Sequence, residues 1–214
     1  MAIGKRNGIT IMLAAATLAG CTVGQGGESD TTVVAQQPPA AAAPVDTAPA
    51  APQPTREMQI EVDLAARKLY VLREEQRLAE YGVAVGSEKW PTQTGEWNIT
   101  QVVWNPEWVP PRDESWTEDK EGKQPGDPDN PLGRVQLIYD PPRTIHGTNE
   151  PASIGKAVSH GSIRMTNATA IELAKRVMEV AGAGKDEAWY DRVQGNRSEK
   201  VIVDLPSPVP IRVR

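Results

Sequence analysis

Apolar and polar residues alternate with a period of two along four separate stretches of this chain. The stretches are residues 58–64, 68–73, 80–85 and 96–104, with polar turns between them. Such alternation directs one face of a strand into a core and the other into water. A fifth strand is predicted at 135–139, shortly after Pro131-Leu132-Gly133. These patterns restrict the folded part of the chain to a β-rich architecture.

Only one stretch carries a strong helical pattern, at about 168–180. Asn167 is its predicted N-cap, and Gly182 and Gly184 end it. A shorter helix is predicted at 186–193, and residues 200–214 are expected to form extended segments broken by prolines. We therefore predict a mainly β domain with one or two helices, closed as a barrel or packed as a sandwich.

The N-terminus predicts a secreted and lipidated protein. Lys5 and Arg6 precede an apolar stretch, 9–19, that is typical of a signal peptide. The stretch ends in Leu18-Ala19-Gly20-Cys21, which resembles the bacterial lipobox. That resemblance implies a lipoprotein signal peptide at 1–20 and lipidation of Cys21, which would anchor the chain to a membrane. An ordinary signal peptide that happens to contain a cysteine is the alternative.

Residues 21–56 are rich in Ala and Pro and almost lack large apolar residues. We expect this segment to be a disordered linker that reaches up to about 100 Å when fully extended. The folded domain is then 57–214. Because Thr22 rather than Asp follows the cysteine, the usual sorting pattern favours the outer membrane, with the domain facing the periplasm.

The composition excludes several classes of function. The net charge of −5 argues against a nucleic-acid-binding protein, which needs a basic face. Two histidines and one cysteine are too few for a structural zinc site, and Cys21 has no cysteine to pair with. We expect no metal and no cofactor, and the sequence gives no indication of an oligomeric state.

Two short segments, 145–148 and 159–165, contain both histidines of the chain, each followed by glycine. Composition alone leaves open whether His146 and His160 share a site or lie there by coincidence. Ser162 lies two residues after His160 and shortly before the predicted helix. Successive backbone amides near a helix start can bind an oxyanion, so this segment is the candidate for chemistry.

The two segments resemble the L,D-transpeptidase (YkuD-type) catalytic domain family. That family shows an Ile-His-Gly-Thr element and, some sixteen residues on, a Ser-His-Gly-Cys-Ile-Arg-Met element; here they are residues 145–148 and 159–165. Further segments that agree are Ile60-Glu61-Val62-Asp63-Leu64, Lys68-Leu69-Tyr70-Val71, Val83-Ala84-Val85-Gly86, Asn105-Pro106-Glu107-Trp108-Val109-Pro110-Pro111 and Asn130-Pro131-Leu132-Gly133. The resemblance runs from about residue 57 to the C-terminus.

The resemblance implies acyl transfer on peptidoglycan stem peptides. The nucleophile would attack the carbonyl of the third, L-centred residue, and the terminal D-alanine would leave. His146 would be the general base and position 162 the nucleophile. The remaining implied roles are oxyanion amides around Gly161, Ser162 and Ile163, a pocket shaped by His160 and Arg164, and substrate contacts from Gly147, Thr148, Ser159 and Trp108.

The sequence departs from the family at the nucleophile, because Ser162 stands where the family has cysteine. A smaller departure is Thr92-Gln93-Thr94-Gly95, which lacks the proline of the family's Thr-Pro-x-Gly turn. A serine hydroxyl needs a positioned base, because it is far less acidic than a thiol. Three interpretations stay open: a serine acyltransferase or L,D-carboxypeptidase, a non-catalytic peptidoglycan-binding module, and a structural lipoprotein that links membrane and wall.

Two other features suggest binding sites and have simpler explanations. Residues 113–130 carry seven acidic residues but lack the spacing of an EF-hand, so we expect a solvated flap rather than a calcium loop. If this segment covers the cleft, it resembles the capping insertions of the family. Six tryptophans could stack on sugars, although packing is the expected role for most of them.

Overall fold

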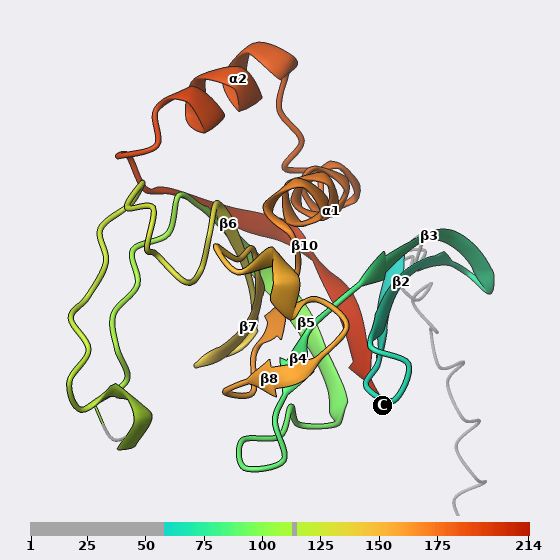
Figure 1. Cartoon of the computed structure of the whole chain (residues 1–214). Helices are drawn as coiled ribbons and strands as arrows, with labels where there is room; N and C mark the ends of the chain where they lie inside the picture. The colour runs from blue at the N-terminus through green and yellow to red at the C-terminus, as the bar shows by residue number, and fades with distance from the viewer. Residues whose placement is uncertain (1–57, 113–114) are drawn as a thin grey trace, which may run out of the picture. The chain divides into compact units, whose positions relative to one another are not determined.

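One eight-stranded sheet forms the framework of the domain (Figure 1). The computed structural model describes residues 58–112 and 115–214. The predicted signal peptide at 1–20, the lipidated Cys21 and the linker at 21–56 all lie outside the described residues. Across the sheet the strands are β3 (Gln76–Gly82), β2 (Lys68–Arg73), β1 (Gln59–Asp63), β10 (Val201–Val213), β5 (Gly95–Trp104), β6 (Val135–Asp140), β7 (Arg143–His146) and β9 (Ile163–Arg164).

Two short strands make a second sheet beside the first. β4 (Val85–Gly86) pairs in parallel with β8 (Ala157–Ser159). Ala84, just before β4, exchanges backbone hydrogen bonds of 2.9 Å in both directions with Arg164 of β9. The small sheet is thereby joined to the edge of the large one, and the mainly β prediction is confirmed.

The C-terminal strand was predicted wrongly as separate extended pieces. β10 is a single strand that pairs in parallel with β1 and antiparallel with β5. Its register against β5 shifts between Asp204 and Val209, the stretch that contains Pro206 and Pro208. A bulge accommodates prolines that lack an amide proton, so the strand continues through them.

The third strand also differs from its prediction, since it spans Gln76–Gly82 rather than 80–85. β2 and β3 form a hairpin, and Glu74 takes a positive φ of 54° at its turn. Pairing with β2 sets where β3 begins. The first residues of β3 lie outside the core, with Leu78 38% exposed, so no alternation of apolar and polar residues marks the start of the strand. The strands predicted at 58–64, 68–73, 96–104 and 135–139 agree with β1, β2, β5 and β6.

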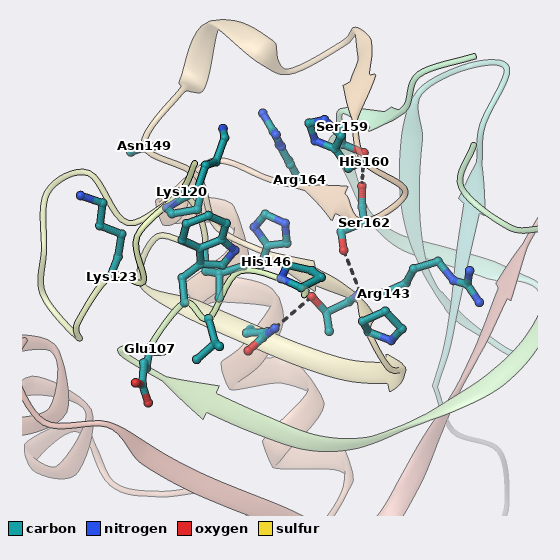
Figure 2. A pocket seen from close by; sticks show the side chains of 18 of the residues that line it. Glu107, Lys120, Lys123, Arg143, His146, Asn149, Ser159, His160, Ser162 and Arg164 are labelled. Atoms are coloured by element: carbon teal, nitrogen blue, oxygen red, sulfur yellow. Dashed lines mark hydrogen bonds between the residues drawn. The ribbon is translucent and has the colours of Figure 1, made fainter. Parts of the chain in front are cut away.

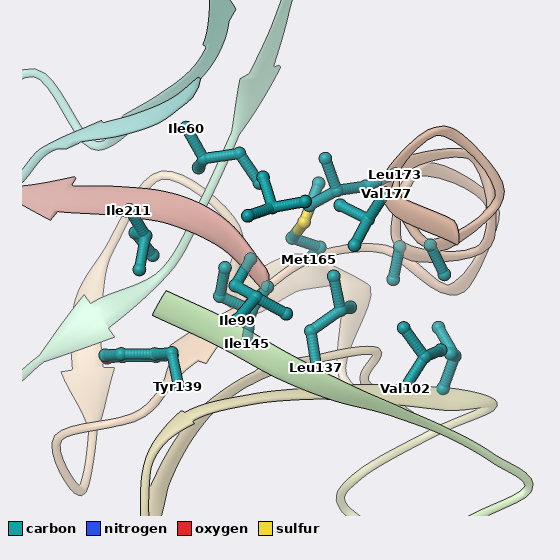
Figure 3. Close-up of a cluster of buried hydrophobic side chains, with 14 of the residues drawn as sticks. Ile60, Ile99, Val102, Leu137, Tyr139, Ile145, Met165, Leu173, Val177 and Ile211 are labelled. Carbon is teal, nitrogen blue, oxygen red and sulfur yellow. The ribbon is translucent and has the colours of Figure 1, made fainter. Parts of the chain in front are cut away.

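The core lies between the sheet and helix α1 (Asn167–Val180). Leu173 and Val177 face the sheet residues Ile60 and Leu137 in Figure 3, and all four are fully buried. The predicted N-cap is wrong by one residue: Thr166 is the cap, and its hydroxyl accepts from the Thr169 amide at 3.2 Å. Asn167 is the first helical residue, and its side chain is used elsewhere.

The second helix, α2 (Glu187–Gly195), begins after Asp186, whose carboxylate accepts from the Trp189 amide at 2.8 Å. Trp189 and Tyr190 both pack against the buried Trp104, with ring centroids 5.9 Å and 5.6 Å away. These ring contacts pack the helix against the domain.

A long connection, residues 105–134, joins β5 to β6, and we call its described part the flap. It contains the one-turn helix η1 (Ser115–Thr117). Trp108 and Lys123 exchange backbone hydrogen bonds of 2.8 Å in both directions across it. At its base, buried Asn105 donates to the Val193 carbonyl (2.9 Å) and buried Asn130 to the Pro106 carbonyl (2.8 Å). The first bond holds the base of the flap against α2, and the second ties the two ends of the flap to each other.

Candidate active site

Ser162 lies at the end of a tight turn that starts from β8. The Ser159 hydroxyl donates to the Ser162 carbonyl at 2.5 Å and accepts from the Gly161 amide at 3.2 Å. Gly161 has a φ of 100°, a conformation that residues with a Cβ rarely adopt. The glycine and Ser159 together fix the path of the turn, which explains why both belong to this motif.

The Ser162 side chain points at the neighbouring strand β7. Its Oγ accepts a hydrogen bond from the Thr144 amide at 3.2 Å. β7 and β9 run parallel, with Ile145 opposite Ile163 and His146 opposite Arg164. This pairing brings His146, the last residue of β7, to the same edge of the sheet as Ser162.

The His146 imidazole is buried, with 5% of the residue exposed. Its Nδ1 lies 2.6 Å from the Gly147 carbonyl oxygen, which can only accept, so Nδ1 carries the proton. Nε2 of the neutral ring then holds a lone pair. Burial lowers the pKa of His146 to about 4; the bond to Gly147 opposes this shift, and the positive charge of Arg164 adds to it. The ring is therefore neutral at pH 7.

His146 and Ser162 lie in the wall of a pocket of about 640 Å³. Figure 2 shows them with Arg164, while Lys120 and Lys123 of the flap line the other side of the pocket. Of the predicted site residues, the pocket is lined by Trp108, His146, Ser159, His160, Ser162 and Arg164. Gly147, Thr148, Gly161 and Ile163 do not line it; they lie in the turns and strand that hold its wall.

The predicted oxyanion amides differ in their bonding. The Gly161 amide is used by Ser159, and Ile163 lies in the β7–β9 pairing. Among the hydrogen bonds of the described residues, none uses the Ser162 amide. That amide is therefore the member of the predicted set that can bind a developing oxyanion.

His160 is part of an aromatic row that crosses the mouth of the pocket. Trp116 of the flap stacks on its ring, with centroids 3.8 Å apart and an interplanar angle of 15°. Trp90, in the loop after β4, also packs against the His160 ring, with the ring centroids 4.4 Å apart. The ring centroids of Trp108 and Trp116 are 6.4 Å apart. The flap thus meets the segment that holds His160 and Ser162 through a ring-on-ring contact.

Two arginines place positive charge beside Ser162. Arg164 forms an ion pair with Glu150 at 3.0 Å and keeps 15% of its side chain exposed. Arg143, which sequence reasoning missed, pairs with Asp140 at 2.6 Å and also lines the pocket. Arg143 carries no motif of its own, and only the position of β7 beside the Gly161 turn brings it to the site.

With this geometry in place, the comparison with known families is decisive. A model of the YkuD family, the L,D-transpeptidase catalytic domain, matches residues 57–203. The chain belongs to this family. The match covers both histidine segments, the flap and both helices.

Two curated relatives come from Bacillus subtilis, and the names of both assign them provisionally to the L,D-transpeptidases. YkuD is 35% identical over 131 residues, which are 60% of this chain and 66% of that protein. YqjB is 32% identical over 122 residues, which are 54% of this chain and 64% of that protein. The matched stretch thus spans slightly less than two thirds of either relative.

Solved structures also resemble the domain. The L,D-transpeptidase from Mycobacterium smegmatis aligns with a TM-score of 0.43 and 18% identity, over 74% of this chain and 58% of that chain. An L,D-transpeptidase from Stackebrandtia nassauensis aligns with a TM-score of 0.41 and 16% identity, over 74% and 55%.

In residues 58–112 and 115–214, no three His, Cys, Asp or Glu side chains gather in a way that could hold a metal ion. Within the same residues, no helix has the length and apolar character needed to cross a membrane.

Proposed function

We propose that the domain is a serine acyltransferase of the L,D-transpeptidase type that acts on peptidoglycan stem peptides. The Ser162 Oγ attacks the carbonyl carbon of the third, L-centred residue, and His146 Nε2 takes the hydroxyl proton. When the peptide bond breaks, His146 returns that proton to the amine of the departing D-alanine. The acyl-Ser162 ester then passes to an amine of another stem, or to water, which would make the enzyme a carboxypeptidase.

The observation that carries this proposal is the hydrogen bond from His146 Nδ1 to the Gly147 carbonyl, which leaves Nε2 as an acceptor. A cysteine site can begin from a thiolate–imidazolium pair, whereas a serine site must remove its proton during attack. The bond from Nδ1 to the Gly147 carbonyl and a pKa of about 4 keep the ring neutral, with Nε2 able to accept. A neutral imidazole with a lone pair on Nε2, in the wall of the same pocket as a serine, is what serine acyl transfer requires of its base.

The bonding of Ser162 also favours oxygen at this position. Its Oγ accepts from the Thr144 amide, and an oxygen accepts a hydrogen bond far better than a thiol sulfur does. The same amide stabilises negative charge that develops on Oγ as the proton leaves. Arg143 and Arg164, in the pocket wall, supply charge suited to the carboxylates of a stem peptide.

A second candidate function is a peptidoglycan-binding module without turnover. The stack of Trp116 on His160 favours it, because the flap there contacts the residue two positions before Ser162. In that case the pocket would bind stem peptides without acylation.

For location, we propose that the chain acts in the bacterial envelope, anchored through a lipid on Cys21 and facing the periplasm, in the outer membrane. The Leu18-Ala19-Gly20-Cys21 segment and Thr22 support this. Cys21→Ala should move the protein out of the membrane fraction while the domain stays folded. An unmodified Cys21 in the mature wild-type protein, found by mass spectrometry, would contradict the anchor.

Turnover of a disaccharide-tetrapeptide decides between the two functions. Release of D-alanine and formation of cross-linked dimer are followed by chromatography for wild type, Ser162→Ala, His146→Ala and Ser162→Cys. The enzyme predicts turnover by wild type that both alanine variants abolish, without additive effects. An inert wild type that binds purified sacculi, next to an active Ser162→Cys, would establish the binding module instead.

A further inference from the structure

We propose that Asn167 is a positioning residue, which fixes the proton of His146 on Nδ1 by clamping the Gly147–Thr148 segment. The proposal rests on the proposed role of His146 as the base. It concerns a side chain that lies outside the pocket and touches neither Ser162 nor His146.

Asn167 begins α1, but its side chain bonds to two other parts of the chain. Its Oδ1 accepts from the Arg134 amide at 2.9 Å, and its Nδ2 donates to the Thr148 carbonyl at 3.0 Å. One side chain amide thereby joins the end of the flap to the turn after β7. Capping of the helix is done by Thr166, so the helix does not require Asn167 for that purpose.

The clamp leaves no space around the Asn167 amide. A Cβ on Gly147 or on Gly133 would overlap Asn167 Oδ1. Glycine is therefore needed at both positions, and at Gly147 the reason is close approach rather than an unusual φ. The backbone of the His-Gly-Thr segment is packed directly against the Asn167 side chain.

The clamped segment is the one that holds His146. The Gly147 amide donates to the Val135 carbonyl at 3.0 Å, and the Gly147 carbonyl accepts from His146 Nδ1 at 2.6 Å. Asn167 bonds to the next carbonyl, that of Thr148. If the clamp is lost, the Gly147 carbonyl can turn away from the ring. The neutral imidazole can then carry its proton on Nε2, where it cannot accept the proton of Ser162.

The test reads the tautomer directly by NMR of the imidazole nitrogens in the full-length protein at pH 7. The chain has two histidines, and the spectrum of His146→Gln assigns their signals. Wild type should show His146 with its proton on Nδ1, and Asn167→Ala should show a mixture of the two tautomers. Asn167→Asp, which has the same size and cannot donate to Thr148, should also shift toward the mixture and serves if the alanine variant does not fold.

Thr166→Ala is the matched control, because it removes the cap of the same helix and leaves the clamp in place. Its His146 tautomer should match wild type. An unchanged tautomer in both Asn167 variants, or an equal shift in Thr166→Ala, would overturn the proposal. The NMR signal does not depend on turnover. An inert wild type would therefore refute the serine enzyme, while the tautomer would still test the role of Asn167.

In an active enzyme the clamp should show itself in kcat rather than in KM. Loss of the hydrogen-bond partner that orients a metal-ligating histidine costs about 10-fold to 100-fold, and we expect a loss of that order in kcat for Asn167→Ala. KM should change little, because Asn167 does not line the pocket. A rise in KM with an unchanged kcat would contradict a positioning role.

Discussion

The two walls of the pocket are built in different ways. The wall of β7 and β9 consists of buried and half-buried residues, and in the turn after β7 both backbone groups of Gly147 are bonded, the amide to Val135 and the carbonyl to His146. The flap is exposed over much of its length, and it meets that wall where Trp116 stacks on His160. The proposed reacting groups, His146 and Ser162, belong to the first wall, and the flap forms the second.

This difference suits one wall to the precise positioning of side chains and the other to the entry of substrate. Proton transfer requires groups that are held within tenths of an ångström, which dense packing and backbone pairing provide. Substrate entry requires a segment that can move at small cost, and one aromatic contact is worth only about 0.5–1.5 kcal/mol beyond its buried area. Substitutions in the two walls should therefore differ in the size and the kind of their effects.

The largest effect is expected for Gly147→Ala in the rigid wall. The added Cβ overlaps Asn167 Oδ1, so the turn must shift away from its place behind His146. We expect a loss of about 1–3 kcal/mol in unfolding free energy and a loss of about 100-fold or more in turnover. Urea denaturation and D-alanine release measure the two.

Gly195→Ala is the control for this change, because a Cβ there meets nothing within 4 Å. It should leave both quantities near the wild-type values. Normal turnover by Gly147→Ala would show that the wall is less rigid than its contacts indicate.

A second prediction concerns pH and the same wall. The pKa of His146 is near 4 in the folded protein and about 6.5 when unfolded, so between these values only the unfolded chain binds the proton. Stability from this group is present above pH 6.5 and is lost as the pH falls toward 4. From pH 7 to pH 4, wild type should lose about 3 kcal/mol more than His146→Gln, which has no such group.

Turnover should follow the folded pKa instead. It should stay level from pH 8 down to about pH 5 and fall only as His146 becomes protonated near pH 4. Denaturation curves at each pH test the stability, and initial rates test the activity. A rate that halves near pH 6.5 would mean that water reaches the ring.

The smallest effect is expected for Trp116→Ala in the flap. The variant loses the stack on His160, so we expect a stability change of about 1 kcal/mol and a turnover change well below that of Gly147→Ala. Limited proteolysis should cut the flap faster than in wild type. If Trp116→Ala abolished turnover as Gly147→Ala does, the flap would belong to the catalytic machinery and the two walls would not be distinct.

The sequence was most informative where a local pattern decides the outcome. Alternation located β1, β2, β5 and β6, because each has one face in the core. It misplaced β3 and divided β10, because pairing with neighbouring strands sets the start of one and carries the other across its prolines. Motif spacing indicated His146 and Ser162, and parallel pairing of β7 with β9 places them at one edge.

What the sequence determined by itself is the family, the mainly β architecture and the presence of serine at position 162, since motifs and alternation can be read from short stretches of the chain. The tertiary structure decided the rest. Asn167, a plausible N-cap by sequence, clamps the turn behind His146 instead, and Arg143 joins the pocket without a motif. Both follow from contacts between segments far apart in the chain, which depend on how the sheet curls and on where α1 packs. No short stretch of sequence contains that information.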